Sequence, residues 1–451
     1  MNLSIIGLGK LGAPMAAVMA HKGHKVVGVD VNPAYVTAVQ QGQAPVDEPG
    51  LAEMMRANRK RLSATMDYDQ AILASDATFI IVPTPSDPDG TFSLRYVLAA
   101  AGKIGAALRK KDGWHLVVLS STVMPGSVEQ SVLPALEVYS GKKCGEEFGL
   151  CYNPEFIALG SVIHDMLNPD MVLIGESDRR SGEILAKLYA GVCESKPRIQ
   201  RMNFVNAELT KLSVNTYVTT KISYANMLAQ VCETLPGADV DAVTAALGCD
   251  SRIGPKYLKG ALGYGGPCFP RDSVAFSALA RMNGVPALLA EATDALNRRQ
   301  VPRLVEMIFA HLPEGGTAGV LGLSYKPGTP VIEESQGLDL AKALLAKGVS
   351  VVVYDPAAME NARDRLKGHV TFAPSAAASA TGADVLAITT PWAEFRGLKP
   401  SDLKPGSAVL DCWRLFADHS LGCGVRLLHL GIGGAVRETD PTEAVSAVEG
   451  D

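Results

Sequence analysis

Three glycines near the N-terminus have the spacing of a turn that binds the phosphates of a dinucleotide. The segment Gly7-Leu8-Gly9-Lys10-Leu11-Gly12 follows a short apolar run and precedes a helical pattern. In such a turn Gly7 permits the tight bend, Gly9 lets a pyrophosphate approach the backbone, and Gly12 lets helix and strand pack closely. The unpaired N–H groups at the start of the helix then face the phosphates.

The carboxylate of Asp30 indicates which dinucleotide this turn would bind. Asp30 ends the second apolar run, at about the distance from the glycines that the pattern requires. A carboxylate at this place accepts a hydrogen bond from the ribose 2′-OH and repels a 2′-phosphate. The sequence therefore favours NAD over NADP. An ordinary strand-to-helix turn with a surface aspartate is the alternative.

The segment Gly263–Asp272 is the second place where residue types suggest chemistry. It holds several glycines, Cys268 and the pair Arg271-Asp272 within ten residues. The glycines would let the backbone approach a ligand, the thiol could act as a nucleophile and the carboxylate as a base. Two alternatives stay open, because most lone cysteines are inert core residues and Asp272 could cap a helix over Asp272–Met282.

Hydroxyl groups in two turns, and two polar residues with helical spacing, are further candidates for functional residues. The turns Val82-Pro83-Thr84-Pro85 and Ser120-Ser121-Thr122-Val123 each follow an apolar run, so their hydroxyls could contact a cofactor or water, or could cap their loops. Lys211 and Asn215 are four residues apart and would share one face of a helix. Spacing alone leaves open whether these two have a common purpose.

Short apolar strands that alternate with helices must position these residues. This rhythm predicts α/β domains whose parallel sheets are covered on both faces. The two α/β parts of the chain share this rhythm, but no internal repeat is detectable between them. Strands are expected at Leu3–Ile6, Lys25–Val29, Ala77–Val82, Leu116–Leu119, Ala318–Leu321, Val351–Tyr354, Asp384–Ile388 and Ala408–Leu410.

A long helical segment separates the two α/β parts. From Val205 to Leu235 the chain has neither Gly nor Pro, so an unbroken helix of roughly 45 Å is expected there. That length suits a spine between domains or the seam of a dimer. The predicted organisation is a Rossmann-like NAD-binding domain over 1–200, a helical dimerisation domain over 201–300 and a second Rossmann-like domain over 301–451.

Composition excludes several other classes of protein. The 451 residues include 42 basic and 47 acidic side chains, a net charge of −5, so no basic excess points to nucleic acid. No apolar run is long enough to span a membrane, and the N-terminus lacks the pattern of a signal peptide. The eight cysteines are scattered, without metal-ligand spacing. We therefore expect a cytoplasmic enzyme with reduced thiols and no bound metal.

Five segments together resemble the UDP-glucose/GDP-mannose dehydrogenase family. Gly263–Asp272 is similar to the family's GFGGxCFPKD signature. The others are similar to its PEF, AExxKxxxN, RIGxxFL and GLxFKxxT motifs and occur in the same order. The resemblance covers residues 1 to about 430, and it is carried by Asn153–Phe156, Ala207–Asn215, Arg252–Leu258 and Gly322–Thr329.

The resemblance implies an NAD-dependent four-electron oxidation of the C6 alcohol of a nucleotide sugar to a carboxylate. Cys268 would add to the intermediate aldehyde and carry a thioester, which water hydrolyses. UDP-glucose is the expected substrate, with GDP-mannose or a UDP-N-acetylhexosamine as alternatives. A two-electron hydroxy-acid dehydrogenase and a non-catalytic nucleotide-sugar sensor are the alternatives of other classes.

The family's functional positions map onto this sequence residue by residue. A homodimer is also implied, in which Arg252 reaches the active site of the neighbouring subunit. The catalytic positions are Cys268, Lys211, Asn215, Asp272, Glu155 and Thr122. The NAD positions are Gly7, Gly9, Leu11, Gly12, Asp30, Thr84, Thr122 and Arg271. The substrate positions are Glu155, Phe156, Lys211, Asn215, Arg252, Tyr257, Leu258, Gly265 and Lys326.

Some positions depart from the family pattern. Glu333 stands where an Arg that contacts NAD is usual, and a carboxylate there would repel the pyrophosphate. We therefore expect the loop around it to run differently. These departures leave the reaction class unchanged but bear on affinity and substrate choice. They are Tyr35, Leu159, Arg271, Pro330, Glu333 and Arg414.

Overall fold

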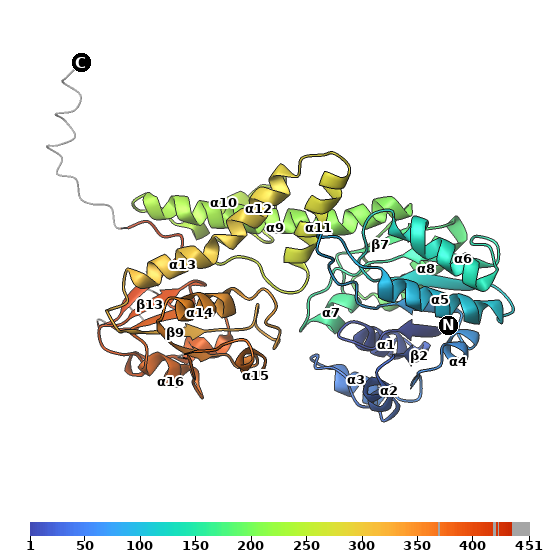
Figure 1. Ribbon diagram of the computed structural model, residues 1–451, viewed down its shortest axis with the longest axis horizontal. Helices are drawn as coiled ribbons and strands as arrows, with labels where there is room; N and C mark the ends of the chain where they lie inside the picture. Colours follow the sequence, from blue (N-terminus) through green and yellow to red (C-terminus); the bar gives the residue numbers. More distant parts are fainter. Residues whose placement is uncertain (369, 418–420, 423, 435–451) are drawn as a thin grey trace, which may run out of the picture. The chain divides into compact units, whose positions relative to one another are not determined.

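The computed structural model describes residues 1–368, 370–417, 421–422 and 424–434 (Figure 1). The chain forms two compact units. Unit 1 comprises Met1–Val214 and Ala275–Pro286, and unit 2 comprises Asn215–Val274 and Ala287–Asp451. Two helices, α9 (Phe204–Thr234) and α11 (Phe269–Met282), each continue from one unit into the other.

Unit 1 is built on an eight-stranded sheet in the order β3-β2-β1-β4-β5-β6-β7-β8. All neighbouring strands are parallel except β6 and β7, which pair antiparallel. The strands are β1 (Asn2–Ile6), β2 (Lys25–Val29), β3 (Leu62–Thr65), β4 (Ala77–Ile80), β5 (His115–Leu119), β6 (Phe148–Tyr152), β7 (Met171–Glu176) and β8 (Arg198–Met202).

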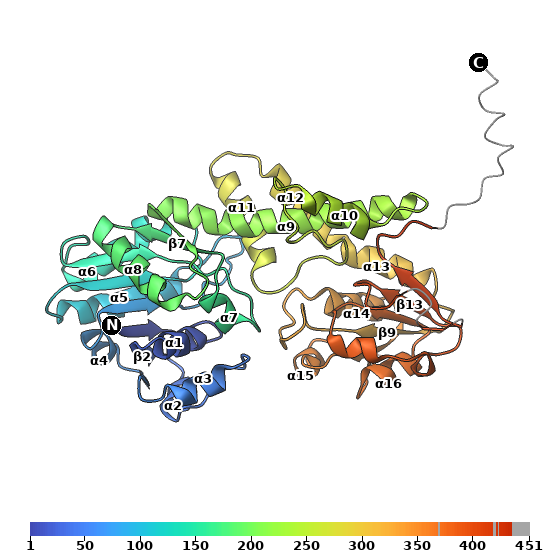
Figure 2. The ribbon, with the colours of Figure 1, turned by 180° about the vertical axis from the view of Figure 1, so that it is seen from behind.

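Helices cover both faces of this sheet, because side chains of the buried strands alternate between two cores. Leu3 and Ile5 of β1 pack with α1, α2, α3, α7 and α8, whereas Ile6 packs with α4, α5 and α6. Figures 1 and 2 show this unit from opposite sides. The helices are α1 (Gly12–His21), α2 (Pro33–Gln40), α3 (Leu51–Ala57), α4 (Tyr68–Leu73), α5 (Arg95–Arg109), α6 (Leu133–Ser140), α7 (Val162–Leu167) and α8 (Arg179–Val192).

Unit 2 is built on a six-stranded parallel sheet in the order β11-β10-β9-β12-β13-β14. Its strands are β9 (Thr317–Leu321), β10 (Ser350–Tyr354), β11 (Val370–Phe372), β12 (Val385–Ile388), β13 (Ala408–Asp411) and β14 (Arg426–His429). Its other helices are α10 (Val240–Cys249), α12 (Leu288–Arg298), α13 (Gln300–Phe309), α14 (Gln336–Ala346), α15 (Met359–Arg363) and α16 (Ala376–Thr381).

The two sheets carry the same turn at the same place, which is a structural repeat that was not detectable in the sequence. Gly7 follows β1 with φ +99°, and Gly322 follows β9 with φ +105°. The carboxylate of Asp30 accepts the N–H of Leu8, and that of Asp355 accepts the N–H of Leu323. Sequence reasoning missed this repeat because residues 8–11 link the first glycine to its helix, whereas residues 323–335 make the second link.

Most predicted elements are confirmed to within a few residues, including the long helix expected over Val205–Leu235. The helix expected to start at Asp272 instead begins at Phe269. Pro270 falls in its first turn, where a missing N–H costs nothing, so it does not delay the helix. Asp272 consequently lies inside the helix, and the alternative that it is an N-cap is wrong. Among the described residues, no helix is long and apolar enough to cross a membrane.

Candidate active site

The glycine turn of unit 1 has the geometry that phosphate binding requires. A Cβ atom on Gly7 would lie 2.1 Å from the carbonyl oxygen of Ile81, and one on Gly12 would lie 1.8 Å from the carbonyl oxygen of Gly7. Only glycine fits at these two positions. Around a Cβ on Gly9, by contrast, no heavy atom of the described chain lies within 4 Å. The backbone at Gly9 therefore faces open space that a pyrophosphate could occupy.

The groups beside this turn also fit NAD. The Asp30 carboxylate accepts backbone N–H groups from Leu8 at 2.6 Å and Asn32 at 2.8 Å, which fixes it next to the glycines. Each oxygen has a second lone pair for a ribose hydroxyl. No described side chain caps the start of α1, and its first turn holds no acidic residue. The positive end of its dipole is therefore available to an anion.

The hydroxyls of the next two turns join those turns to each other. Thr84 donates from its hydroxyl to the carbonyl oxygen of Thr122 at 2.8 Å. Ser121 accepts the N–H of Val82 and donates to the carbonyl oxygen of the same residue. These contacts match the loop-capping interpretation. They leave a cofactor role open for Thr84, because a hydroxyl that donates once can still accept, and for Thr122, because its contact uses the backbone carbonyl and not the hydroxyl.

Glu155 is a carboxyl group with an unusual titration in unit 1. The Tyr189 hydroxyl lies 3.1 Å from its Oε1 atom and 2.5 Å from Oδ1 of Asn153. Burial raises the pKa of Glu155 to about 7, against the opposing effects of the Tyr189 hydroxyl and the Lys211 ammonium. A carboxyl group with this pKa can take up and release protons near neutral pH, as a general base must.

Lys211 holds the segment that carries Glu155. Its ammonium donates to the backbone carbonyl of Glu155 at 2.7 Å and lies 4.7 Å from the centre of the Phe156 ring. One turn earlier on α9, Glu208 is fully buried and accepts the N–H groups of Gly126 and Val128, and burial raises its pKa to about 7. Sequence reasoning gave Glu208 no role, although it belongs to the AExxK segment that pointed to the family.

In unit 2, Cys268, Asp272 and Asn215 are brought together at the start of α11. Cys268 is exposed and directly precedes the helix, and its carbonyl accepts the N–H of Asp272 at 2.9 Å. The Asp272 carboxylate is buried and accepts a hydrogen bond from Nδ2 of Asn215 at 2.6 Å. The Arg271 guanidinium lies beside it, with Nε 3.4 Å from Oδ1. A thiolate at the N-terminus of a helix is stabilised by the helix dipole.

The predicted substrate positions of unit 2 lie around this segment. Tyr257 is exposed and adopts a positive φ of 65°, whereas Leu258 is buried. A Cβ on Gly265 would lie 2.2 Å from the carbonyl oxygen of Glu334, so the residue must be glycine. Lys326 is half-buried in the same loop as Glu334. Arg252 is exposed and forms a two-point ion pair with Asp250.

The departures from the family pattern have structural settings of their own. Tyr35 and Leu159 pack against the core that α1 covers. Arg414 pairs with Asp239 at 2.5 Å and donates to the carbonyl oxygens of Leu430 and Gly431. The carboxylate of Glu333 is exposed, while its backbone carbonyl accepts the N–H of Gly266. Arg414 thus supports the fold of unit 2.

The fold and the glycine turn define the class of this protein. In both units six parallel strands follow the doubly wound order 3-2-1-4-5-6. A glycine turn follows the first strand and a carboxylate follows the second. These features define a dinucleotide-binding α/β domain. Residues 1–193 match the NAD binding domain of the UDP-glucose/GDP-mannose dehydrogenase family, residues 205–299 its central domain and residues 319–418 its UDP binding domain. The chain belongs to this family.

Individual relatives agree with the family assignment. The chain is 40% identical to UDP-glucose 6-dehydrogenase AglM of Haloferax volcanii over 402 residues, 88% of this chain and 93% of that protein. It is 37% identical to a GDP-mannose 6-dehydrogenase of Azotobacter vinelandii, over 82% and 84% of the two chains. A solved UDP-glucose dehydrogenase from Pyrobaculum islandicum superposes with a TM-score of 0.86 at 36% identity, over 96% and 98% of the chains. The resemblance inferred from the motifs is thereby confirmed.

Proposed function

We propose that this protein is an NAD-dependent UDP-glucose 6-dehydrogenase, which converts the C6 alcohol of UDP-glucose to the carboxylate of UDP-glucuronate. The observation that carries the proposal is the segment Gly263–Asp272, which presents an exposed Cys268 beside a buried Asp272–Asn215 pair in a chain of this family. The similarity to AglM of Haloferax volcanii and to the Pyrobaculum islandicum enzyme, both UDP-glucose dehydrogenases, favours UDP-glucose over GDP-mannose.

We divide the chain into an NAD-binding domain over 1–200, a central domain over 201–300 and a nucleotide-sugar-binding domain over 301–451. The ranges of the three family matches support this division. We place the enzyme in the cytoplasm, which suits the buried thiols of Cys151, Cys232 and Cys412 because thiols persist in a reducing compartment.

In this proposal the glycine turn of unit 1 holds the pyrophosphate of NAD, and Asp30 holds the adenosine ribose. When bound, NAD accepts the hydride that leaves C6. The N–H groups at the start of α1 face the phosphates, and the bare backbone at Gly9 lets them approach. The residues assigned to NAD are Gly7, Gly9, Leu11, Gly12, Asp30, Thr84, Thr122 and Arg271.

Cys268 makes the second oxidation possible. An aldehyde cannot lose a second hydride until a nucleophile has added to its carbonyl carbon. The Cys268 thiolate forms the new C–S bond, the resulting thiohemiacetal loses its hydride to become a thioester, and water breaks the C–S bond to release the carboxylate and the thiol. Overall one alcohol and one water become one carboxylate and three protons, and two hydrides leave to two NAD molecules.

Polar side chains assist these steps. We assign to Lys211 and Asn215 the hydrogen bonds that stabilise the tetrahedral oxyanions, since both are donors on one face of α9. Glu155, with a pKa near 7, acts on the water that attacks the thioester, and Thr122 orients that water. Asp272 is fixed by Asn215 and takes part in proton transfer through water.

The sugar nucleotide is assigned to Phe156, Tyr257, Leu258, Gly265 and Lys326, together with Glu155, Lys211 and Asn215. A panel of nucleotide sugars tests the choice of substrate. We expect kcat/KM for UDP-glucose to exceed that for GDP-mannose and for UDP-N-acetylglucosamine by at least about tenfold, the worth of one hydrogen bond to a charged group. A higher kcat/KM for GDP-mannose would contradict the UDP-glucose assignment.

Cofactor choice follows from Asp30. We expect NAD to be preferred over NADP by at least about tenfold in kcat/KM, from one lost ribose hydrogen bond and the repulsion of a 2′-phosphate. Asp30→Ala should narrow this preference, and Asp67→Ala, which removes an exposed helix-capping carboxylate in the same unit, should leave it unchanged. Equal kcat/KM values for the two cofactors with the unaltered enzyme would contradict the assignment.

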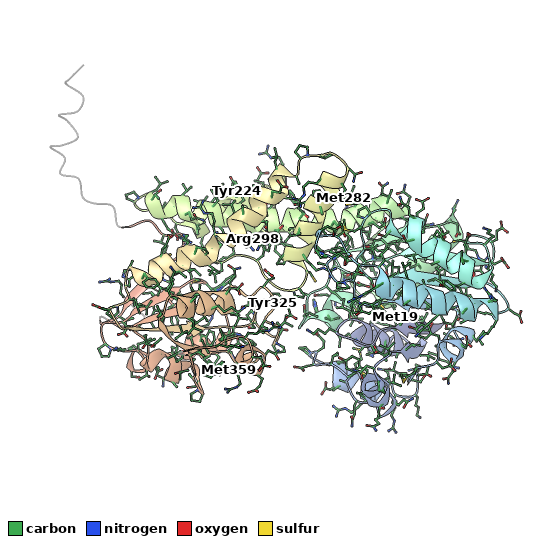
Figure 3. All side chains as sticks on the ribbon, in the orientation of Figure 1. Met19, Tyr224, Met282, Arg298, Tyr325 and Met359 are labelled. Carbon is green, nitrogen blue, oxygen red and sulfur yellow. The ribbon has the colours of Figure 1, made fainter. Side chains whose placement is uncertain are left out.

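We further propose a homodimer in which Arg252 reaches the active site of the neighbouring subunit. In unit 2, α9 exposes Tyr217, Tyr224 and Val231, which are 64%, 47% and 47% exposed. The seven-residue spacing places these three residues in one stripe along the helix. Tyr224, at the middle of the stripe, is labelled in Figure 3. An exposed apolar stripe of this kind suits burial against a second copy of the same helix.

Sedimentation tests this assembly. The unaltered enzyme should sediment as a dimer, and the double variant Tyr217→Glu/Tyr224→Glu as a monomer of low activity, because two charges would be buried at the seam. Tyr96→Glu, at an exposed tyrosine of unit 1, is the control and should stay dimeric. Arg252→Ala should raise KM for the sugar nucleotide. A catalytically competent monomer, or an unchanged KM in the Arg252 variant, would contradict the shared site.

A further inference from the structure

Two buried side-chain amides hold the backbone that leads to Cys268. On α9, Oδ1 of Asn226 accepts the N–H of Ala261 at 3.0 Å, and its Nδ2 donates to the carbonyl of Leu262 at 2.9 Å. On α12, Oδ1 of Asn297 accepts the N–H of Tyr264 at 2.8 Å, and its Nδ2 donates to the carbonyl of the same residue at 3.0 Å. Each amide therefore pairs with backbone groups as the neighbouring strand of a sheet would.

The geometry of the two amides leaves little freedom to this backbone. An amide has its acceptor on one side and its donors on the other, so two such bonds fix both its orientation and that of the backbone it meets. Asn226 and Asn297 are 2% and 7% exposed, so water cannot replace these bonds cheaply. Asn226 and Asn297 lie on two different helices, and they hold Ala261–Leu262 and Tyr264 respectively.

Two glycines of this segment are explained by the helices on which it packs. A Cβ on Gly263 would lie 2.3 Å from Oδ1 of Asn297, and one on Gly260 would lie 2.9 Å from the backbone oxygen of Ala225. The expectation that the glycines serve the approach of a ligand therefore needs correction at Gly263. Its missing side chain makes room for the amide that holds its neighbour, Tyr264.

The remaining residues up to Cys268 are held from other directions. The N–H of Gly266 donates to the carbonyl of Glu333 at 2.9 Å, and a Cβ on Gly266 would lie 2.6 Å from the Tyr325 ring. The rings of Tyr264 and Phe269 meet edge to face at 6.5 Å. Figure 3 labels Tyr325, and also Arg298, the residue after Asn297 on α12. Cys268 thus follows a segment that is fixed from residue 261 to residue 266.

We propose that Asn226 and Asn297 are positioning residues for the Cys268 nucleophile. The proposal rests on the proposed function, in which the thiolate must meet the aldehyde after the first oxidation. A displacement of about 1 Å at a reacting centre can cost roughly 10²-fold in rate. The first oxidation does not use the thiol. Loosening the segment should therefore slow the second oxidation and spare the first.

Single turnovers with limiting UDP-glucose and excess NAD separate the two oxidations. In the unaltered enzyme two NADH form per sugar. In Asn297→Ala and in Asn226→Ala, we expect the first NADH to form at a rate within about threefold of that of the unaltered enzyme. The second NADH should form at least about tenfold more slowly than in the unaltered enzyme, which is less than the roughly 10²-fold that a 1 Å displacement can cost. Semicarbazide should then trap aldehyde. Asn297→Asp, which keeps the acceptor for Tyr264, should recover part of the second rate.

Asn58→Ala provides the matched control. Asn58 is 7% exposed and also donates from its side-chain amide to a backbone carbonyl, that of Met54 in unit 1. This variant should lose stability and keep both oxidation rates in their normal ratio. If Asn297→Ala and Asn226→Ala also keep that ratio, whatever their stability, the two amides are merely structural and the proposal is overturned.

Hydrogen exchange of the backbone amides gives a second readout that does not depend on turnover. The exchange of residues 261–266 should be at least about tenfold faster in each alanine variant, because the N–H of Ala261 or of Tyr264 loses its acceptor and the segment then opens more often. Unchanged exchange in this segment would overturn the proposal. If the unaltered enzyme forms no NADH with any nucleotide sugar, the proposed function fails, and the exchange of residues 261–266 still decides whether the amides hold the segment.

Discussion

Replacement of Cys268 by serine or alanine is expected to reduce steady-state turnover by roughly 10³- to 10⁶-fold, the range seen when a catalytic nucleophile is removed. A serine hydroxyl is much harder to deprotonate than a thiol, and the ester it forms is hydrolysed more slowly than a thioester. The Cys268→Ser enzyme should therefore accumulate a covalent acyl adduct, which the mass of the intact protein would reveal. Steady-state NADH formation measures the loss of turnover.

The exposure of Cys268 makes the experiment informative, because the substitution removes little packing. The residue precedes α11 and is exposed, so both variants should keep the fold. Cys249→Ser is a matched control at another exposed cysteine of the same unit and should retain full activity. If Cys268→Ala still forms two NADH per sugar at close to the normal rate, the covalent route is wrong and a hydrated aldehyde must be the second hydride donor.

Replacement of Glu155 by glutamine is expected to have the second largest effect, a loss of roughly 10²- to 10⁴-fold in turnover, as for removal of a general base. The amide keeps the size of the carboxyl group but cannot take a proton from the attacking water. The covalent thioester on Cys268 should then accumulate, which intact-protein mass would show. Glu183→Gln, at an exposed carboxylate on α8, is the control and should be fully active.

The pH dependence follows from the raised pKa of Glu155, which lies at about 7. The base must be ionised, so the rate of thioester hydrolysis should rise as pH increases from 6 to 8 and level off above. The free energy of unfolding changes with pH in the opposite direction to the rate. Between the ordinary glutamate pKa of roughly 4.3 and the raised pKa of about 7, Glu155 is protonated in the folded state and ionised in the unfolded state. Its contribution to stability therefore falls as pH rises through this range. A rate independent of pH over this range would contradict the role of Glu155.

Local features were predictable from the sequence because their geometry depends on neighbouring residues. The turn Gly7–Gly12 is an example, since a positive φ and close backbone contacts demand glycine wherever this turn forms. Cys268 and Asp272 were found because they stand with several glycines within ten residues, and their roles came from the resemblance of this segment to the family signature. The start of α11 was predicted at Asp272, three residues late, although proline is tolerated in the first turn of a helix.

Long-range contacts explain what the sequence did not reveal. Asn226 and Asn297 hold residues that are more than 30 positions away in the chain, and no spacing rule connects them. Glu208 similarly binds N–H groups some 80 residues earlier. The second glycine turn at Gly322 was hidden by the longer loop that follows it. For Asn226, Asn297 and Glu208 the physical signal is a buried polar group, which becomes visible only when the fold is known.

The central claim is that one active site oxidises the same carbon twice. The most direct test is to count the NADH formed per UDP-glucose when the sugar is consumed completely in excess NAD by the unaltered enzyme. We expect two NADH per sugar, with UDP-glucuronate as the product. One NADH per sugar, with an aldehyde or ketone as the product, would contradict it and indicate a two-electron dehydrogenase.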